Sequence, residues 1–514
     1  MSEESRPQIV LIRPPLCIAK STIALRDGLP SLSLAFLSAA AKGAGYRVRV
    51  IDAFIEGHDQ VRSDSDGVVN IFGISIDEIV RRIPKGTPVI GLSLMYTHEN
   101  FLYRELITAI SRAHPESAVL IGGEHATFFC ADLLSEFPSI KAACIGEGDD
   151  TLVDLLGNVL SGFPVLADIA GIAYMRQGQL CTTPRRDRIR DLTRLPLPDW
   201  DACGIERYLD NHISLALLGK RVIPVLASRG CPYRCTFCSN ERFWGGTWCA
   251  RPIDQVVSEI EEYIEKYRVE AVDFYDPSLV VNKQWIRDFA SELIRRKVRV
   301  SWEMPIGTRA ESFSRDILRL LKESGLSRLN YAPESGSEKV IRAIKKNLDP
   351  VQILRSMREA VLEGLFVRAH LIMGTPDQDY GDVFRDFVFI SKSALIGVHD
   401  ISIFPFVVFP GTEAYEDMKK TGLIDSEAFR RTLKTNSTSN PKGSYTWNRR
   451  FSGSMVYRIS ILLMLYFYFL QYSLRPWRVF GIISNIIRKR SVTSVDRFVY
   501  YLLSRKRALR TFVD

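Results

Sequence analysis

The sequence lacks a long uninterrupted apolar run. Its most hydrophobic segment, ISILLMLYFYFLQY (459–472), is about four helical turns long, shorter than the ~20 residues that span a bilayer. The start, MSEESRPQIVLIRPP, has no basic stretch followed by an apolar stretch, so we expect no secretory signal. The proportions of hydrophobic (46%) and charged (25%) residues are those of a globular protein and argue against extensive disorder. These features predict a cytoplasmic protein.

The regular cysteine pairs of a disulfide-stabilised protein are also missing. The chain has nine cysteines, and three of them lie close together, which indicates a reducing compartment and a metal or cluster site. The net charge of +9 is concentrated at one end, because residues 448–514 contain 13 Lys and Arg but only two acidic residues. The remainder is close to neutral. Because the basic residues alternate with aliphatic ones, we expect no nucleic-acid partner.

Short apolar runs alternate with helical segments in the first third of the chain. Buried strands are expected at 8–12, 47–53, 88–94, 118–123 and 143–148. Between them, segments such as LSLAFLSAAAKGAG (32–45) have the composition of a helix that ends at glycine. The pattern predicts a Rossmann-like parallel sheet with ligands bound beyond the carboxyl ends of its strands.

A second strand–helix series follows a proline-containing segment at 186–202. Its strands are expected at 222–228, 271–275, 300–305, 327–333, 366–374 and 400–406. Six such units predict a partial (β/α)6 barrel of TIM type, with its active site at the carboxyl ends of the strands. We therefore divide this α/β chain into a first domain (1–185), a linker (186–221), a barrel (222–430) and a basic, hydrophobic helical C-terminal region (431–514).

The segment RGCPYRCTFCSNERFWG (230–246) follows the first barrel strand and contains Cys231, Cys235 and Cys238. A structural zinc site usually has four ligands, and no second Cys/His pair lies nearby, since Cys249 is isolated. A [4Fe–4S] cluster held by three thiolates keeps one iron open for another ligand. The spacing and the position at the barrel mouth favour a cluster over zinc or three buried thiols.

This motif resembles the C-x₃-C-x-(aromatic)-C signature of the radical S-adenosylmethionine (SAM) superfamily, with Phe237 as the aromatic residue. The resemblance continues, in order, through FYDPS, GTRAE, YAPESGSEKV, HLIMGTPDQD and FPFVVFPGTEAY. It implies that the amino and carboxylate groups of SAM bind the fourth iron. It also implies that one-electron cleavage of SAM yields a 5′-deoxyadenosyl radical.

The resemblance further assigns residues to the SAM site. Phe237 should lie near the adenine, Glu334 and Ser335 near the ribose or methionine end, and Arg309 and Gly374 in motifs that border the cofactor. The alternatives are an N-cap or surface carboxylate for Glu334 and a structural salt bridge for Arg309. Asp276 lies where other members carry Gly-Gly-Glu, which this sequence lacks.

Residues 8–150 resemble the cobalamin-binding module that precedes many radical SAM barrels, notably in VIGLSLMYTHEN, VLIGGEHATFF and CIGEGDDTL. The resemblance implies that Gly122 and Gly123 let the backbone approach cobalamin closely. It implies that Ser93 and Thr97 hydrogen-bond the nucleotide tail of cobalamin. These residues form the expected cobalamin site.

The cobalt ligand of some family members is absent here. Their Asp-x-His-x-x-Gly motif would place aspartate and histidine at Gly28 and Pro30. Either cobalt has no protein ligand on that face, or the domain has lost cobalamin and only supports the barrel. His98 and His125 are candidate substitutes, but hydrogen-bonding loop or core roles are favoured for both.

Two interpretations of the C-terminal region are left open. Segment 459–472 and the basic segments after it can form helices at an anionic membrane interface, with Trp477 at headgroup level. The protein would then lie at the inner face of the membrane. Alternatively, these helices pack on the barrel. Similar tails occur in family members with lipophilic substrates, which suggests a lipophilic small-molecule substrate.

Together, the motifs predict a cobalamin-dependent radical SAM enzyme with a [4Fe–4S] cluster, SAM and cobalamin as cofactors. The resemblance implies a C-methyltransferase that acts on an unactivated carbon, with a flavodoxin or ferredoxin as electron donor. One alternative is an oxidative cyclase or ring-rearranging enzyme with the same cofactors and no net methyl transfer. The other is a non-catalytic, membrane-associated metal-binding protein.

Overall fold

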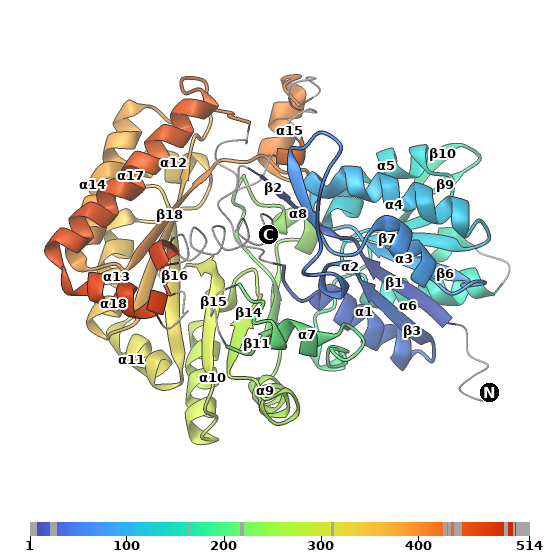
Figure 1. Ribbon diagram of the computed structural model, residues 1–514, viewed down its shortest axis with the longest axis horizontal. Helices are drawn as coiled ribbons and strands as arrows, with labels where there is room; N and C mark the ends of the chain where they lie inside the picture. Colours follow the sequence, from blue (N-terminus) through green and yellow to red (C-terminus); the bar gives the residue numbers. More distant parts are fainter. Residues whose placement is uncertain are drawn as a thin grey trace, which may run out of the picture.

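The computed structural model describes residues 8–20, 28–161, 165–215, 220–309, 313–424, 429, 433–435, 445–487, 492–496 and 499. Two α/β halves lie side by side, and the C-terminal helices cover the outer side of the second half (Figure 1). This arrangement confirms the predicted α/β fold.

The first half is a seven-stranded sheet in the order β10-β9-β8-β7-β6-β1-β3. Its parallel strands are β1 (Gln8–Arg13), β3 (Arg47–Asp52), β6 (Val89–Ser93), β7 (Ala118–Gly122) and β8 (Ile140–Cys144). Strand β8 begins three residues before the expected 143–148 and ends at Cys144. An antiparallel hairpin, β9 (Ile172–Arg176) and β10 (Gln179–Thr182), extends the edge.

Helices cover both faces of this sheet, as the strand–helix alternation predicts. Helices α1 (Leu32–Gly43) and α6 (Asp149–Leu160) pack on one face. Helices α3 (Ile76–Arg82), α4 (Asn100–Ala113) and α5 (Glu124–Glu136) pack on the other. The apolar strand residues are therefore buried on both sides.

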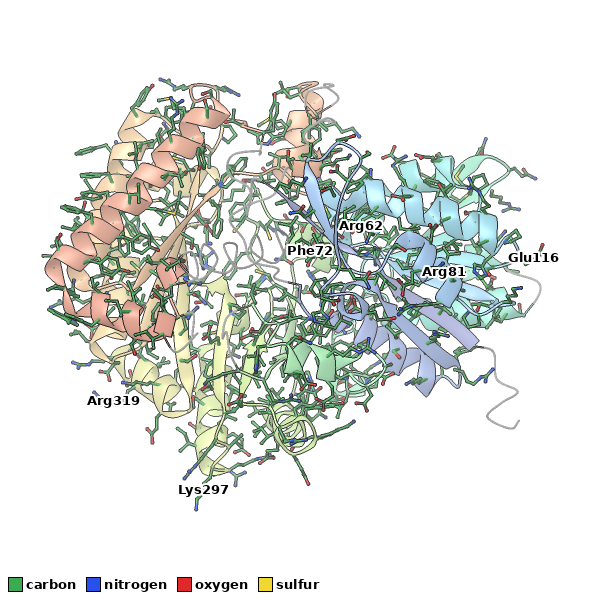
Figure 2. The ribbon with its side chains drawn as sticks, in the orientation of Figure 1. Arg62, Phe72, Arg81, Glu116, Lys297 and Arg319 are labelled. Atoms are coloured by element: carbon green, nitrogen blue, oxygen red, sulfur yellow. The ribbon has the colours of Figure 1, made fainter. Side chains whose placement is uncertain are left out.

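A small antiparallel sheet, which the sequence pattern does not predict, lies beside the first half. It consists of β2 (Leu16–Ala19), β5 (Val69–Phe72) and β4 (Val61–Ser63). Arg62 and Phe72 mark it in Figure 2. Arg62 Nη1 donates to the carbonyl oxygen of Gly73 at 2.9 Å, which secures the end of β5.

The second half is an open barrel of six parallel strands whose spatial order follows the chain. They are β11 (Val222–Val225), β14 (Ala271–Phe274), β15 (Ser301–Thr308), β16 (Leu326–Glu334), β17 (Phe366–Met373) and β18 (Asp400–Pro405). The helices that follow these strands include α9 (Ile253–Tyr267), α10 (Lys283–Arg295), α11 (Arg315–Glu323), α12 (Glu338–Ala343), α13 (Pro350–Leu362) and α14 (Tyr380–Ile396). The partial (β/α)6 barrel is thus confirmed, with each strand close to its expected position.

The C-terminal region contains α17 (Gly453–Leu474) and α18 (Trp477–Ile487). Helix α17 is longer than the four turns expected, and by length and composition alone it could cross a membrane. It packs along α14 and β18. Gln471 donates to the carbonyl oxygen of His399 at 3.1 Å, and the Tyr468 hydroxyl donates to Asp400. Packing on the barrel, one of the two interpretations of this region, is therefore observed for α17.

Candidate active site

The cysteine loop leaves the barrel through a short hairpin. Strands β12 (Ser228–Gly230) and β13 (Trp248–Ala250) pair antiparallel on either side of it. Gly230 has a φ of 88°, and a Cβ at this position would lie 2.0 Å from the carbonyl oxygen of Thr247. Only glycine fits there. The residue before Cys231 therefore fixes the path of the chain into the loop.

Two distant parts of the barrel hold the middle of this loop. The Thr236 N–H donates to the carbonyl oxygen of Ile344 at 3.1 Å, and the Thr236 carbonyl accepts from the N–H of Ala414 at 3.0 Å. Asn240 Nδ2 donates to Cys238 Sγ at 3.1 Å. The loop is thus held by backbone contacts on both sides, with one thiol already oriented by a hydrogen bond.

The three thiols lie in one loop, between Gly230 and Asn240. Burial raises the pKa of each, that of Cys238 to about 12, and the Cys231 and Cys235 thiols raise the Cys238 pKa further. In the opposite direction, the positive charges of Arg309 and Lys346 lower the pKa of Cys231 and Cys235. The site therefore has cations that favour thiolates, the form that binds iron.

The thiols are not arranged as a ligand set for a single metal ion in the described part of the chain. Among the described residues, no three His, Cys, Asp or Glu side chains are placed to hold one metal ion. A zinc ion requires all its sulfurs within about 2.3 Å of one centre, whereas a [4Fe–4S] cluster gives each thiolate its own iron. A cluster with three thiolate ligands is thus consistent with the loop.

Glu334 and Lys346 form a buried ion pair beside the loop. Glu334, at the end of β16, has a φ of 64°, a conformation that a non-glycine residue adopts at a cost. Lys346 Nζ lies 6.0 Å from the centre of the Phe237 ring. The surface and N-cap alternatives for Glu334 are therefore wrong. Lys346, which the sequence analysis missed, thus lies near both Glu334 and Phe237, two predicted SAM residues.

Arg309 lies against the start of the cysteine loop. Its guanidinium carbon is 3.9 Å from the centre of the Tyr233 ring, a close cation–π contact. Its Nη2 also donates to the carbonyl oxygen of Asn347 at 3.3 Å. Arg309 thus connects the loop to the segment that carries Lys346.

The structure gives Ser335 and Gly374 structural contacts. Ser335 is fully buried and donates to Asp386 at 2.6 Å. Gly374 has a φ of 89°, and a Cβ there would lie 3.0 Å from Val456 of α17. These contacts support the turns after β16 and β17. Contact of either residue with SAM remains a proposal.

Asp276 accepts hydrogen bonds from the N–H of Ala227, at 3.2 Å, and from the Ser228 hydroxyl. Its carboxylate therefore joins the end of β14 to β12. Burial raises the pKa of Asp276 to about 7. Asp276 therefore stabilises the hairpin from which the cysteine loop begins.

The predicted cobalamin residues lie at the carboxyl edge of the first sheet. Ser93 ends β6 and pairs in register with Gly122 at the end of β7. Gly123 has a φ of 107°, and a Cβ there would lie 2.5 Å from the carbonyl oxygen of Leu94. At Gly122 the nearest atom, Cys144 Cβ, is 3.6 Å away, so the fold itself does not require glycine there. The absence of a side chain at Gly122 leaves the sheet edge open to a large flat ligand.

His125 has both ring nitrogens engaged within the first half. Nδ1 lies 3.2 Å from Thr97 Oγ1 and Nε2 lies 3.0 Å from Asn100 Oδ1. Burial lowers the pKa of His125 to about 3 and that of His98 to about 4, so both rings are neutral. The contacts of His125 are those of a hydrogen-bonding core residue.

A hydrogen-bonded cluster of side chains that the sequence analysis missed contacts the Gly28–Pro30 turn. Arg13, the last residue of β1, donates to the Tyr208 hydroxyl at 2.7 Å and to the carbonyl oxygen of Leu29. Tyr208, from linker helix α7 (Ile205–Asp210), donates to Asp52 at 2.7 Å. Arg13 therefore stabilises the turn in which Pro30 occupies the position of the histidine cobalt ligand.

The barrel meets the first half at two places near the cysteine loop and the last strand. Arg229, two residues before Cys231, donates to Asp149 at the start of α6 at 2.8 Å. A Cβ at Gly411, beyond β18, would lie 2.2 Å from the Phe128 ring of α5, so these segments are in close contact. The segments that follow the first and last barrel strands therefore lie against the first half.

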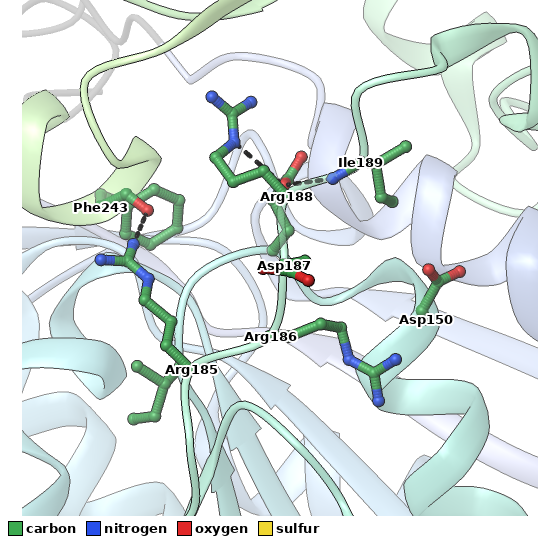
Figure 3. A pocket seen from close by; sticks show the side chains of 9 residues that line it. Asp150, Arg185, Arg186, Asp187, Arg188, Ile189 and Phe243 are labelled. Carbon is green, nitrogen blue, oxygen red and sulfur yellow. Dashed lines mark hydrogen bonds and ion pairs between the residues drawn. The ribbon is translucent and has the colours of Figure 1, made fainter.

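Two arginines, one at the end of the first domain and one in the linker, contact the segment after the cysteines. Arg185 reaches the carbonyl oxygen of Phe243, beside a small cavity between the halves (Figure 3). Arg188 Nη1 donates to the carbonyl oxygens of Trp244 and Thr247 at 2.8 and 3.0 Å. The linker thus holds the segment that follows the cysteines.

Comparisons with known proteins agree with this arrangement. Residues 225–389 match the model of the Radical SAM superfamily, and residues 23–156 match that of the B12 binding domain. The cytidylyl-2-hydroxyethylphosphonate methyltransferase of Streptomyces wedmorensis is 27% identical over 464 residues, which cover 83% of this chain and 84% of that protein. The anaerobic magnesium-protoporphyrin IX monomethyl ester cyclase of Rubrivivax gelatinosus is 28% identical over 311 residues, 59% of this chain and 54% of the cyclase.

Among solved structures, the radical SAM methyltransferase TsrM of Kitasatospora setae superposes with a TM-score of 0.63. It is 16% identical, and the match covers 80% of this chain and 76% of TsrM. This likeness shows that the two proteins share a fold. Since the B12 binding domain precedes the radical SAM domain and the cysteine loop lies within the latter, this protein is an enzyme of the cobalamin-binding radical SAM family, whose cofactors are a [4Fe–4S] cluster, SAM and cobalamin.

Proposed function

We propose that this enzyme methylates an unactivated carbon of a small, lipophilic substrate. The observation that carries the proposal is that the cysteine loop is held against the cobalamin-binding half, through Arg229 and Asp149 at 2.8 Å and through Arg188, which donates to the carbonyl oxygens of Trp244 and Thr247. A methyl donor held by the first half can then reach a substrate held at the barrel mouth. When bound, the cluster and SAM supply a radical that removes hydrogen from carbon, and cobalamin supplies the methyl group.

The balance of this reaction defines its products. Each turnover would consume the substrate, two molecules of SAM and two electrons. It would release the methylated substrate, S-adenosylhomocysteine, 5′-deoxyadenosine and methionine. The electrons require an external one-electron donor, for which we propose a flavodoxin or ferredoxin.

The residues of the chain have separate parts in this proposal. Cys231, Cys235 and Cys238 hold the cluster. Phe237 and Glu334 border SAM, and Lys346 between them offers a positive charge for its carboxylate. Arg309, Ser335 and Gly374 complete the proposed SAM site, while Ser93, Thr97, Gly122 and Gly123 form the proposed cobalamin edge.

Anaerobic reconstitution with iron and sulfide tests the cluster assignment without a known substrate. The wild-type enzyme should bind about four irons per chain and slowly form 5′-deoxyadenosine from SAM under reducing conditions. Alanine at Cys231, Cys235 or Cys238 should abolish both properties. Cys249→Ala is the matched control, because Cys249 lies across the hairpin opposite Arg229, and it should retain both. Normal iron content in the Cys235→Ala enzyme would refute the assignment.

A second candidate function is oxidative cyclisation or ring rearrangement without net methyl transfer. The similarity to the magnesium-protoporphyrin cyclase favours it, although that match covers less of this chain than the methyltransferase match. Co-products separate the two functions. A methylase forms S-adenosylhomocysteine together with 5′-deoxyadenosine, whereas a cyclase forms only 5′-deoxyadenosine.

The proposal also includes a place in the cell. We propose that the enzyme is cytoplasmic and lies at the inner face of the membrane, where a lipophilic substrate would be available. The basic character of residues 448–514 supports this location, because the cytoplasmic membrane surface is anionic.

A further inference from the structure

Helix α17 has an apolar stripe on the side that faces away from the barrel. Its buried side consists of Val456, Ser460, Leu463, Phe467 and Gln471. Leu462, Leu465 and Phe469 each follow one of these buried residues by two positions, so they lie on the opposite side of the helix. Their side chains are 65%, 60% and 72% exposed. A surface helix normally carries polar residues at such positions. The outer side of α17 is therefore apolar where water would favour polar side chains.

Helix α14 continues this apolar surface. The ring of its exposed Phe384 stacks on Phe387 with centroids 6.1 Å apart, and Phe387 contacts Tyr466 of α17 at 4.6 Å. The Tyr466 hydroxyl also lies 3.0 Å from Ser391 Oγ, so the two helices are joined along their sides. The surfaces of α14 and α17 form one face.

Helix α18 extends the face beyond the end of α17. Its exposed apolar side chains are Trp477, Val479, Phe480, Ile483 and Ile487. Arg475, which precedes this helix, donates from Nη1 and Nη2 to the carbonyl oxygens of Ala394 and Leu395 at 2.9 and 2.8 Å. Arg475 thus fixes α18 against the end of α14. We call the outer surface of α14, α17 and α18 the apolar face.

The exposed charges of the apolar face have one sign. Arg385, Lys392 and Arg458 are exposed. The acidic residues of α14, Asp382 and Asp386, are buried, and the sequence from Gly453 to Ile487 has none. An apolar surface with only cations at its solvent side is complementary to an anionic lipid bilayer.

We propose that the apolar face docks on an anionic phospholipid bilayer, with α17 lying along the surface rather than crossing it. This inference specifies the membrane location proposed above and does not depend on methyl transfer. The contacts of Tyr468 with Asp400 and of Gln471 with His399 fix the inner side of α17 to β18. The apolar face lies on the side of the barrel away from the first half (Figure 1), so docking leaves the junction between the halves clear.

A second copy of the chain is the competing occupant of this face. Arg385 is paired with Asp382 at 3.1 Å, but in a symmetric dimer Lys392 and Arg458 of the two copies would approach each other without exposed acidic side chains on these helices, which costs free energy. An anionic bilayer instead pairs with those cations and covers the apolar side chains. Charge therefore favours lipid.

Vesicle flotation of the full-length protein tests the proposal. We expect binding to phosphatidylcholine vesicles that contain about 30% phosphatidylglycerol, little binding to pure phosphatidylcholine, and several-fold weaker binding at about 0.5 M salt. Leu465→Glu and Phe469→Glu should each weaken binding about tenfold or more, since each replaces a lipid-facing apolar side chain with an anion. Leu180→Glu is the matched control, because Leu180 is an exposed leucine on β10 in the other half of the protein.

Several results would overturn the proposal. One is no vesicle binding by the wild-type protein. The others are binding to neutral vesicles as strong as to anionic ones, and binding by Leu465→Glu and Phe469→Glu as strong as by the wild type. Resistance to washing at alkaline pH would indicate a spanning helix, and a dimer that Leu465→Glu dissociates would indicate a second copy. Circular dichroism melting should show that the variants remain folded. Formation of 5′-deoxyadenosine by the same preparations reports the proposed chemistry separately, so failure of one proposal does not imply failure of the other.

Discussion

Arg229 donates hydrogen bonds from Nη1 and Nη2 to the two carboxylate oxygens of Asp149, at 2.8 and 3.1 Å. The contact crosses from the barrel to the cobalamin-binding domain, and both side chains are buried. Arg229 lies two residues before Cys231, so the cysteine loop starts at this contact. Glu147 joins it by accepting from Arg229 Nη1 at 3.2 Å and from Arg188 Nε at 3.1 Å. The network fixes the position of the cluster loop relative to the first half.

We expect Arg229→Met to reduce methyl transfer more than SAM cleavage. The variant leaves the Asp149 carboxylate buried without its partner, which typically costs about 3–5 kcal/mol of unfolding free energy. The cluster can still form, but the loop is no longer fixed to the domain that holds cobalamin. Urea unfolding measures the first effect. The ratio of 5′-deoxyadenosine to S-adenosylhomocysteine formed measures the second, and it should rise several-fold.

A neighbouring ion pair provides the control for this prediction. Arg194 Nη2, from the linker, contacts Asp150, the residue after Asp149 in α6, at 2.7 Å, but the two side chains are 56% and 37% exposed. Exposed pairs contribute about 1 kcal/mol or less. Arg194→Met should therefore leave stability and the product ratio nearly unchanged. Equal effects of the two variants would show that burial of the Arg229 contact has no special role.

Gly122 and Gly123 should respond differently to alanine. Gly123 has a φ that favours glycine, and its Cβ would approach the Leu94 carbonyl at 2.5 Å, so Gly123→Ala should destabilise the protein by about 1–3 kcal/mol or more. Gly122→Ala has room in the folded protein. If cobalamin lies against this edge, Gly122→Ala should keep the melting temperature of the cofactor-free protein but weaken cobalamin retention. Unchanged retention, measured by visible absorbance after gel filtration, would remove Gly122 from the proposed site.

Asp386 should make stability depend on pH. Burial raises its pKa from 3.8 to about 7, although Ser335, the Gly336 N–H and Gln378 donate to it and lower the pKa. The folded protein therefore holds a proton that the unfolded chain releases. This contribution to stability is full below pH 4 and is lost as the pH rises through about 7.

The variant Asp386→Asn isolates this effect because asparagine does not titrate. Its unfolding free energy relative to wild type should rise by roughly 2–4 kcal/mol between pH 4.5 and pH 8. Asp417→Asn is a suitable control, since Asp417 is an exposed residue of α15 (Glu413–Lys420). A constant difference between wild type and Asp386→Asn across this range would contradict the prediction.

Much of the fold was predictable because burial imposes a period on the sequence. The strands of both halves are apolar runs bounded by turn residues, and their observed limits differ from the expected ones by a few residues. The hairpin of β12 and β13 was not predicted. Its strands have three residues each and include Arg229 and Cys249, so no alternation of polar and apolar residues marks them.

The site was only partly predictable, for a different reason. The three cysteines are neighbours in sequence, and their motif alone indicates a cluster. The contacts of Arg229 with Asp149 and of Arg188 with Thr247 join residues that are far apart in the chain, and each forms only once the two halves meet. A single sequence contains no pattern for such pairs. The segment CIGEGDDTL resembles part of the cobalamin-binding module, but its Asp149 pairs with Arg229 at the domain junction.

Lys346 and Glu334 provide the last prediction. Each variant, Lys346→Met or Glu334→Gln, leaves one member of a buried pair without its partner and should lower the unfolding free energy by about 3–5 kcal/mol. The double variant buries no unpaired charge. The loss of unfolding free energy in the double variant should therefore be smaller than the sum of the two single losses, by about 1–3 kcal/mol.

Lys346 should also act on the cysteine thiols. Its charge lowers the pKa of Cys235 and Cys231, so in Lys346→Met the alkylation of these thiols in the iron-free protein should require a higher pH. Lys345→Met is the matched control, because the neighbouring Lys345 is exposed and pairs with Glu413 at 2.7 Å. A purely structural role for Lys346 would change stability without moving the alkylation profile. Movement of the profile in Lys346→Met alone would show that this lysine sets the charge of the cluster loop before iron binds.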